Sequence, residues 1–217
     1  MRITILMPYF GAWPAWGGYY LETCRFNAEI EWLFFTDDAR PRNRPPNVRF
    51  VEMTLEGFNR LATAKLGIPV TVETPYKICD ARPAFGAIFA DYLTGVDFWG
   101  HSDVDMMYGD IARFVTPGML AAWDVITPYT VSCGHFQLYR NREPINSLFR
   151  RRDDYPRAFV GAQYELFDHV KFNEVLAAAG DIRWWRVDSY HDELAKPRCH
   201  VGATIAESGA ISYEPKT

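Results

Sequence analysis

The feature that most constrains the fold is a short, almost wholly apolar segment, Ile3–Met7, which stops at Pro8. Such a run suits a strand that is buried on both faces, as in parallel sheets covered by helices on both sides. A predicted helix, Tyr19–Asn27, and a second apolar strand, Ile30–Phe35, follow it. This order of strand, helix and strand predicts an α/β fold with a mainly parallel central sheet.

Segments of the same two kinds continue along the chain. Further strands are predicted at Val48–Met53, from Val96 onward, and at Asp124–Thr127, Phe136–Tyr139 and Ile182–Val187. Helices are predicted at Leu55–Leu66, Pro83–Leu93 and Tyr164–Ala179, and no element is predicted from Lys196 on. We expect one domain over residues 1–217, with the strand ends at Pro8, Thr36 and Ser102 opening onto one cleft, because α/β sheets bind ligands beyond the carboxyl ends of their strands.

Two carboxylates in the spacing D-x-D follow the apolar run Val96–Trp99. If the strand extends through them, side-chain alternation places Asp103 and Asp105 on the same face, with Val104 turned inward. Carboxylates that lie so close repel each other, and a hard divalent cation with oxygen ligands relieves the repulsion. Since 15 of the 217 residues are Asp, about one D-x-D is expected by chance, so the motif alone is only a hypothesis.

Composition excludes several classes of protein. The formal net charge of −4 argues against a general nucleic-acid binder, which would carry a basic excess. The four cysteines, at positions 24, 79, 133 and 199, have no C-x-x-C spacing, so neither a zinc site nor a disulfide framework is indicated. The apolar run before Pro8 is too short for a signal peptide or a membrane span. We therefore expect a cytoplasmic protein without a transmembrane segment.

Polar residues follow the first two predicted strands. Tyr9, in the turn Pro8–Gly11, is a candidate wall of the ligand site, and the alternative is a plain strand-to-loop turn. Asp37 and Asp38 end the second strand, where one carboxylate could accept hydrogen bonds from a ribose or base. The alternative for this pair is capping of the turn before the Pro-rich loop that starts at Arg40.

A group of charged residues precedes the predicted helix Pro83–Leu93. If Pro83 is the first helical residue, Lys77, Asp80 and Arg82 lie near the helix N-terminus, where backbone N–H groups favour an anion such as a pyrophosphate. The alternative is a capped helix with solvated charges. Further along, His135 is either a ligand-binding or a structural histidine. The basic run from Arg140 to Arg157 could meet an acidic acceptor or a membrane surface, or form a solvated face.

Three ordered motifs together resemble a known family. They are Pro75–Gly86, Asp97–Asp105 with Gly109–Ile111, and Gly134–Asn141. They resemble a family of bacterial GT-A-like glycosyltransferases that was first catalogued as a domain of unknown function, and the likeness extends from about Ile3 to Asp188. Relatives run on further, so we expect a short member of the family or a fragment.

The resemblance implies a GT-A-like fold that binds a nucleotide sugar, with Mn²⁺ or Mg²⁺ on Asp105 and Asp103. It suggests a UDP- or GDP-sugar donor and a saccharide or lipid-linked saccharide acceptor, at the inner face of the membrane or in the cytoplasm. Phe167-Asp168 matches the first two residues of a family Phe-Asp-Glu, whereas His169 replaces its Glu.

The resemblance suggests a role for each of these side chains. Lys77 and Arg82 would contact phosphate, and Asp80 would orient Lys77 or touch the sugar. Asp168 would face the cleft and deprotonate the acceptor if the reaction inverts. The alternative is an exposed helix carboxylate that pairs with Lys171.

Two other function classes remain open from the sequence. A metal-dependent nucleotidyltransferase also needs paired carboxylates, but it places a Gly-rich, basic loop after its first strand, which Pro8–Gly11 is not. A non-catalytic protein that binds carbohydrate or nucleotide on the same scaffold is the second alternative.

Overall fold

The structure is a computed structural model, and it describes residues 1–38, 44–132, 134–186, 200–205 and 211–216. Most of the predicted Pro-rich loop, with Cys133 and Cys199, lies outside these residues. The chain divides into two compact units, Met1–Arg186 and Val187–Thr217. The expectation of one domain over the whole chain stays a prediction.

The first unit is built around a seven-stranded sheet with the order β3-β2-β1-β5-β7-β6-β9. Its strands are β1 (Ile3–Pro8), β2 (Ile30–Thr36), β3 (Val48–Glu52), β5 (Phe98–Ser102), β6 (Val125–Thr127), β7 (Phe136–Arg140) and β9 (Trp184–Arg186). The strands from β3 to β5 are parallel, with Ile3 opposite both Ile30 and Phe98. Strand β7 is antiparallel to its neighbours β5 and β6, while β6 and β9 are parallel. The predicted α/β fold with a mostly parallel sheet is confirmed.

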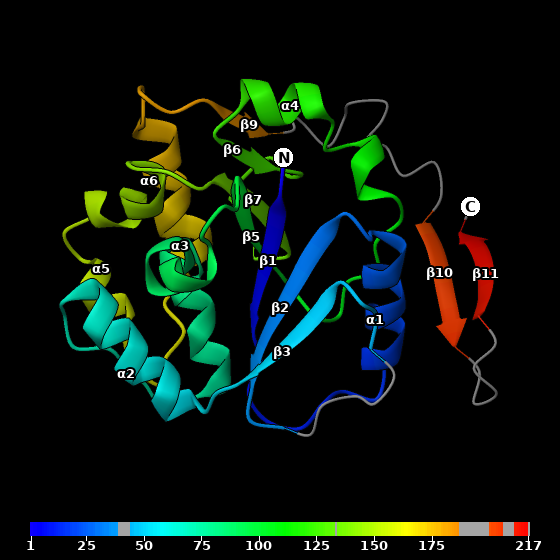
Figure 1. The fold of residues 1–217 in the computed structure, drawn as a ribbon, viewed down its shortest axis with the longest axis horizontal. Helices are drawn as coiled ribbons and strands as arrows, with labels where there is room; N and C mark the ends of the chain where they lie inside the picture. The colour runs from blue at the N-terminus through cyan, green and yellow to red at the C-terminus, as the bar shows by residue number, and fades with distance from the viewer. Residues whose placement is uncertain (39–43, 133, 187–199, 206–210, 217) are drawn as a thin grey trace. The chain divides into compact units, whose positions relative to one another are not determined.

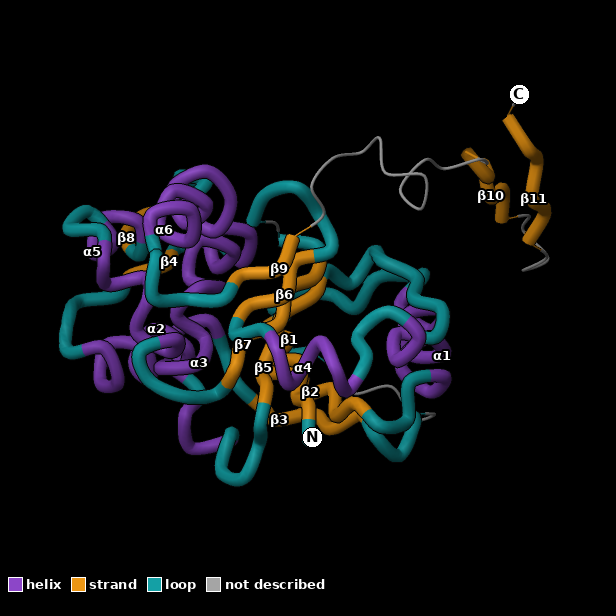
Figure 2. The backbone as a smooth tube through the Cα atoms, turned by 90° about the horizontal axis from the view of Figure 1, so that it is seen from above, coloured by secondary structure: helices purple, strands orange, loops and turns teal. Residues whose placement is uncertain are grey.

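Helices cover both faces of this sheet (Figure 1). The helices of these two layers are α1 (Gly17–Phe26), α2 (Leu55–Leu66), the single turn α3 (Phe85–Ile88), α4 (Pro117–Ala122) and α6 (Phe172–Ala178). Along β2, Trp32 and Phe34 pack in the core with α1, whereas Leu33 and Phe35 pack in the core with α2 and α3. Successive side chains of a strand point to opposite faces, so the one apolar strand β2 contributes side chains to the cores on both faces of the sheet. Figure 2 shows the sheet between these two layers.

Shorter elements join this framework. They are the two-stranded parallel sheet of β4 (Thr71–Val72) and β8 (Val160–Gly161), α5 (Tyr155–Ala158), the 3₁₀ segments η1 (Pro75–Ala84), η2 (Ala90–Tyr92), η3 (Ile111–Arg113) and η4 (Ile145–Arg151), and the π-helical turn η5 (Phe167–Lys171). Within the described residues, no helix combines the length and apolarity needed to cross a bilayer.

The prediction of one continuous helix over Pro83–Leu93 is wrong. Pro83 lies inside η1 rather than at a first helical position, and α3 and η2 follow as separate short turns. A 3₁₀ turn bonds residue i to i+3, so the ten residues of η1 wind more tightly than an α-helix. Phe85, Ile88 and Phe89 are nevertheless buried, as their spacing predicted.

The predicted helix Tyr164–Ala179 also begins later than expected. Leu166 has a left-handed backbone with φ 58°, the π turn η5 follows it, and only then does α6 start. The second unit contains a hairpin of β10 (His200–Ile205) and β11 (Ile211–Lys216), which pair antiparallel. No element was predicted there from the sequence.

Candidate functional site

A cavity of about 670 Å³ opens at the carboxyl ends of β1 and β5. Its walls come from Leu6–Phe10, from His101–Asp105, from η1 and from the segment between Tyr164 and His169. The strand ends at Pro8 and Ser102 therefore open onto one cleft, as predicted. Thr36, the third expected strand end, is buried and does not line the cavity.

The D-x-D carboxylates leave the sheet instead of extending β5. The strand ends at Ser102, the backbone N–H of Asp103 donates to the carbonyl oxygen of His135 (3.1 Å), and Val104 and Asp105 form a turn. The expectation that strand alternation aligns Asp103 and Asp105 is therefore wrong. Both carboxylates still line the cavity, and Asp105 is exposed while Asp103 is half-buried.

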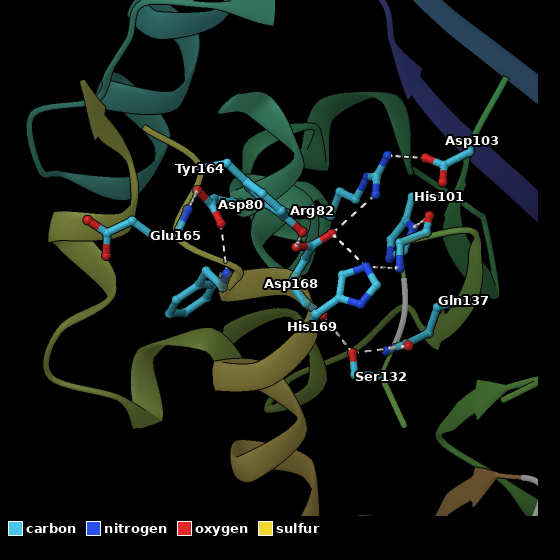
Figure 3. Close-up of polar contacts among 12 residues, drawn as sticks. Asp80, Arg82, His101, Asp103, Ser132, Gln137, Tyr164, Glu165, Asp168 and His169 are labelled. Carbon is cyan, nitrogen blue, oxygen red and sulfur yellow. Dashed lines mark hydrogen bonds and ion pairs between the residues drawn. The ribbon is translucent and has the colours of Figure 1, made fainter. Parts of the chain in front are cut away.

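Arg82 joins two of the predicted site residues. Its guanidinium forms ion pairs with Asp103 and, at 3.1 Å, with Asp168, and its side chain is 12% exposed (Figure 3). Gly134 makes room for it, since a Cβ at that position would lie 1.9 Å from an Arg82 guanidinium nitrogen. Arg82 lines the cavity and so presents positive charge beside the D-x-D turn.

Asp168 is buried behind the cavity wall. Its side chain is 1% exposed, and it accepts hydrogen bonds from Arg82 and from the Tyr164 hydroxyl, the latter at 2.6 Å. Burial raises the pKa of the Asp168 carboxyl against the opposing effects of Arg82 and Tyr164. The alternative of an exposed carboxylate paired with Lys171 is wrong, because the Lys171 amine binds Glu165 at 2.7 Å instead.

Lys77 and Asp80 form a fully buried ion pair below the cavity. Both side chains are 0% exposed, and the Lys77 amine lies 2.9 Å from the carboxylate. Asp80 also accepts backbone hydrogen bonds from Glu165 (2.9 Å) and Phe167 (2.7 Å), on either side of Leu166. Asp80 does orient Lys77, as expected, but neither side chain lines the cavity, so a contact between Lys77 and a phosphate does not fit this burial.

Two of the other three predicted contacts line the cavity. Tyr9 and His135 line it, and the exposed His135 ring lies 6.2 Å from the ring of His169. Asp37 does not line it. One Asp37 oxygen accepts the backbone N–H of Gly11 (2.9 Å) and so holds the loop after β1, a contact that neither the ribose-or-base role nor capping before the Pro-rich loop had predicted.

Several cavity residues were not singled out from the sequence as site residues. Tyr76, Cys79, Tyr164, Leu166 and His169 all line the cavity. Burial raises the pKa of the Cys79 thiol to about 12, so it stays protonated at neutral pH. Tyr76 and Cys79 lie within the motif Pro75–Gly86, and His169 follows the matched pair Phe167-Asp168, so these motifs were the available signals. Tyr164 and Leu166 lie outside the motifs, and the helix predicted from Tyr164 did not indicate that they line a cavity.

The basic run is mostly ion-paired. Arg151 binds Asp181 at 2.6 and 2.7 Å, and Arg152 binds Asp154 and Glu174. Arg140 and Arg142 both bind the buried Asp124. These pairs favour the solvated-face alternative over a cationic patch for a membrane.

The expectation of a bound metal stays a prediction. Within the described residues, no group of three or more His, Cys, Asp or Glu side chains is arranged to hold an ion. Asp103 is paired with Arg82, whereas the exposed Asp105 makes no hydrogen bond or ion pair with the described residues. Carboxylate oxygens suit Mg²⁺ and Mn²⁺, and Mg²⁺ commonly binds one or two carboxylates together with substrate phosphates.

Comparison with known proteins gives one family and several solved structures, two of which are described below. The sequence model of a family described as "Family of unknown function (DUF6625)" matches residues 5–205. No curated protein matches the chain. The galactosyltransferase LgtC, in complex with donor and acceptor sugar analogues, is 13% identical with a TM-score of 0.47, over 91% of this chain and 82% of that chain. An active-site mutant of LgtC is 12% identical, with the same TM-score of 0.47 and the same coverage of 91% and 82%.

Proposed function

The chain belongs to the family of unknown function DUF6625, and we propose that it is a glycosyltransferase that uses a nucleoside-diphosphate sugar. The main observation behind this proposal is that Arg82, Asp103 and Asp105 line one cavity at the carboxyl ends of β1 and β5. These residues come from two of the three motifs that resemble glycosyltransferases. At this edge of a parallel sheet the Arg82 cation suits a diphosphate directly, and the two carboxylates suit one that carries a divalent cation.

The donor diphosphate would lie between Arg82 and the D-x-D turn. The Arg82 guanidinium, which Asp168 holds in place at 3.1 Å, would donate hydrogen bonds to the oxygens of the diphosphate. Asp105 and Asp103 would hold Mn²⁺ or Mg²⁺, which supplies positive charge to the departing diphosphate. Tyr9 and His135 would border the nucleoside, and a UDP- or GDP-sugar is the expected donor.

The acceptor would be a saccharide or a lipid-linked saccharide. If the reaction inverts, Asp168 would serve as the base. The Asp168 carboxylate does not line the cavity. It is bound to Tyr164 and Arg82, and both of these side chains line the cavity. A proton from the acceptor would therefore reach Asp168 by way of the Tyr164 hydroxyl.

The loop after β1 argues against the nucleotidyltransferase alternative. It carries Tyr9 and Phe10 into the cavity and contains no basic residue between Pro8 and Trp16. A non-catalytic binding protein would share the cavity, and turnover separates that alternative from the proposed enzyme.

The experiment compares Asp105→Asn with Asp110→Asn. Both residues are exposed, but only Asp105 lines the cavity, so Asp110 is a matched control for the loss of one charge. We expect Mn²⁺-dependent binding of UDP or GDP, measured by calorimetry, to weaken at least tenfold in Asp105→Asn alone. Unchanged affinity in that variant would exclude the metal role.

Turnover and thermal-shift assays with UDP-, GDP-, CMP- and dTDP-linked sugars, with and without Mn²⁺, would identify the donor. A ligand that binds only the folded state raises its melting temperature. Nucleotide binding without any sugar transfer or donor hydrolysis would favour the non-catalytic alternative.

A further inference from the structure

Leu166 combines an unfavourable backbone with an exposed apolar side chain. It is the one non-glycine residue with positive φ among the described residues, with φ 58° and ψ 31°. A left-handed backbone is unfavourable for a residue with a Cβ, and glycine would adopt it freely. The side chain is 47% exposed and lines the cavity, so core packing does not explain a leucine here.

The surrounding chain holds this conformation rigidly. Asp80 accepts the N–H groups of the residues on both sides, Glu165 and Phe167, and is itself neutralised by the buried Lys77. The carbonyl oxygen of Leu166 accepts the N–H of Val170 at 3.0 Å at the start of the π turn. Strained residues and π turns that the structure over-determines in this way occur preferentially at functional sites.

The neighbours of Leu166 extend the apolar wall. Tyr164 lines the cavity two residues away, and its ring packs edge-on against Tyr76 with centroids 5.2 Å apart. Tyr76 is 68% exposed, and the Tyr164 hydroxyl is bound to Asp168, so both present ring surface. Tyr76 lies in η1, the element that also carries Arg82, so the apolar wall borders the charged groups assigned to the diphosphate within one cavity.

We propose that Leu166, Tyr76 and Tyr164 form an acceptor subsite that binds an alkyl chain attached to the acceptor sugar. This inference rests on the proposed function, since it assigns part of the same cavity to the acceptor. An aliphatic side chain without hydrogen-bonding groups gains affinity only by removing hydrocarbon from water, which a free saccharide offers poorly. The wall includes Tyr164, whose hydroxyl binds Asp168 and is placed to receive the acceptor proton, and so it belongs to the acceptor side of the cavity.

The test measures binding of methyl and hexyl β-D-glucosides and β-D-galactosides, below their micellar concentrations, by calorimetry or NMR titration. We expect the wild-type protein to bind the hexyl glycosides more tightly than the methyl glycosides. Leu166→Gly should reduce the affinity for hexyl glycosides by about five- to tenfold, because half of a leucine side chain is lost from the contact. Its melting temperature should stay within about 2 °C of wild type, because glycine accepts the left-handed backbone.

Two further variants serve as controls for this interpretation. Leu166→Asn, which also tolerates this backbone, should lose the preference for the hexyl chain like Leu166→Gly. Val160→Ala removes an equally exposed apolar side chain, 46% exposed, that does not line the cavity, and should keep the preference.

Three outcomes would overturn the subsite. The first is equal affinity of the wild-type protein for methyl and hexyl glycosides. The second is an unchanged preference for the hexyl glycosides in Leu166→Gly. The third is a weakened affinity of Leu166→Gly for UDP or GDP, which would assign Leu166 to the donor site. Glycoside binding needs no nucleotide, so failure of the proposed transferase activity is observed separately in the Asp105 experiment.

Discussion

Asp80→Asn should be among the most destabilising conservative changes in the first unit. The substitution keeps the size of the side chain but removes the charge that neutralises Lys77, and both side chains are 0% exposed. It also weakens the charge-assisted hydrogen bonds from the N–H groups of Glu165 and Phe167, at 2.9 and 2.7 Å. The buried lysine is then left without a counter-charge in a medium where no water can solvate it.

Removal of one member of a buried ion pair costs about 3–5 kcal/mol of unfolding free energy. Total stabilities are about 5–15 kcal/mol, so the loss is a large fraction of the whole. For a unit of this size it corresponds to a fall in melting temperature of roughly 6–20 °C. The matched control is Glu56→Gln, which breaks the surface pair with Arg60, 81% and 66% exposed, and should cost at most about 1 kcal/mol.

Urea unfolding of Asp80→Asn, Lys77→Met and the double variant measures the coupling directly. We expect the double variant to be more stable than Asp80→Asn by at least about 1 kcal/mol, because methionine removes the uncompensated charge and retains most of the packing volume. A loss below about 1 kcal/mol in Asp80→Asn, or a double variant no better than the sum of the single changes, would refute the reasoning.

Two further predictions concern Asp168 and His101. If Asp168 is the acceptor base, Asp168→Asn should lower kcat by about 10²–10⁴-fold, whereas donor affinity should fall far less, because Arg82 keeps its ion pair with Asp103. Wild-type turnover in this variant would exclude the role. Burial and the nearby Arg82 hold the pKa of His101 well below its usual value, so the folded state does not take up the proton that the unfolded state binds below about pH 6.5. The unfolding free energy should therefore fall as the pH drops below 6.5, by up to about 1.4 kcal/mol per pH unit, and urea titrations should show a flatter profile in His101→Gln.

The sheet was predictable because its strands are local apolar patterns. Each of β1, β2 and β3 is bounded by turn residues, and the strand–helix–strand order leaves few alternatives to a parallel sheet. The helix α2 matches its predicted bounds, Leu55–Leu66, because Thr54 caps its start and Gly67 adopts the left-handed backbone at its end. Such signals lie within a few residues of the element that they define.

The candidate site was harder to predict because its geometry depends on contacts far apart in the chain. The sequence placed Lys77 near a solvent-facing helix start, but Asp80 meets the backbone 85 and 87 residues away and both side chains become buried. Asp103 likewise turns out of β5 because the carbonyl oxygen of His135 accepts its N–H. Neither event has a local sequence signature.

Arg82 explains why residues from distant motifs occur together. Its guanidinium fits only because Gly134 lacks a Cβ, and the N–H of the same Gly134 donates to the His169 ring nitrogen at 3.0 Å. Arg82 then binds Asp103 from the D-x-D motif and Asp168 from the segment after Tyr164. The Arg82 guanidinium thus links its own segment to those of Asp103 and Asp168 around the cavity, so a change in any of the three alters the charge that the cavity presents to a diphosphate.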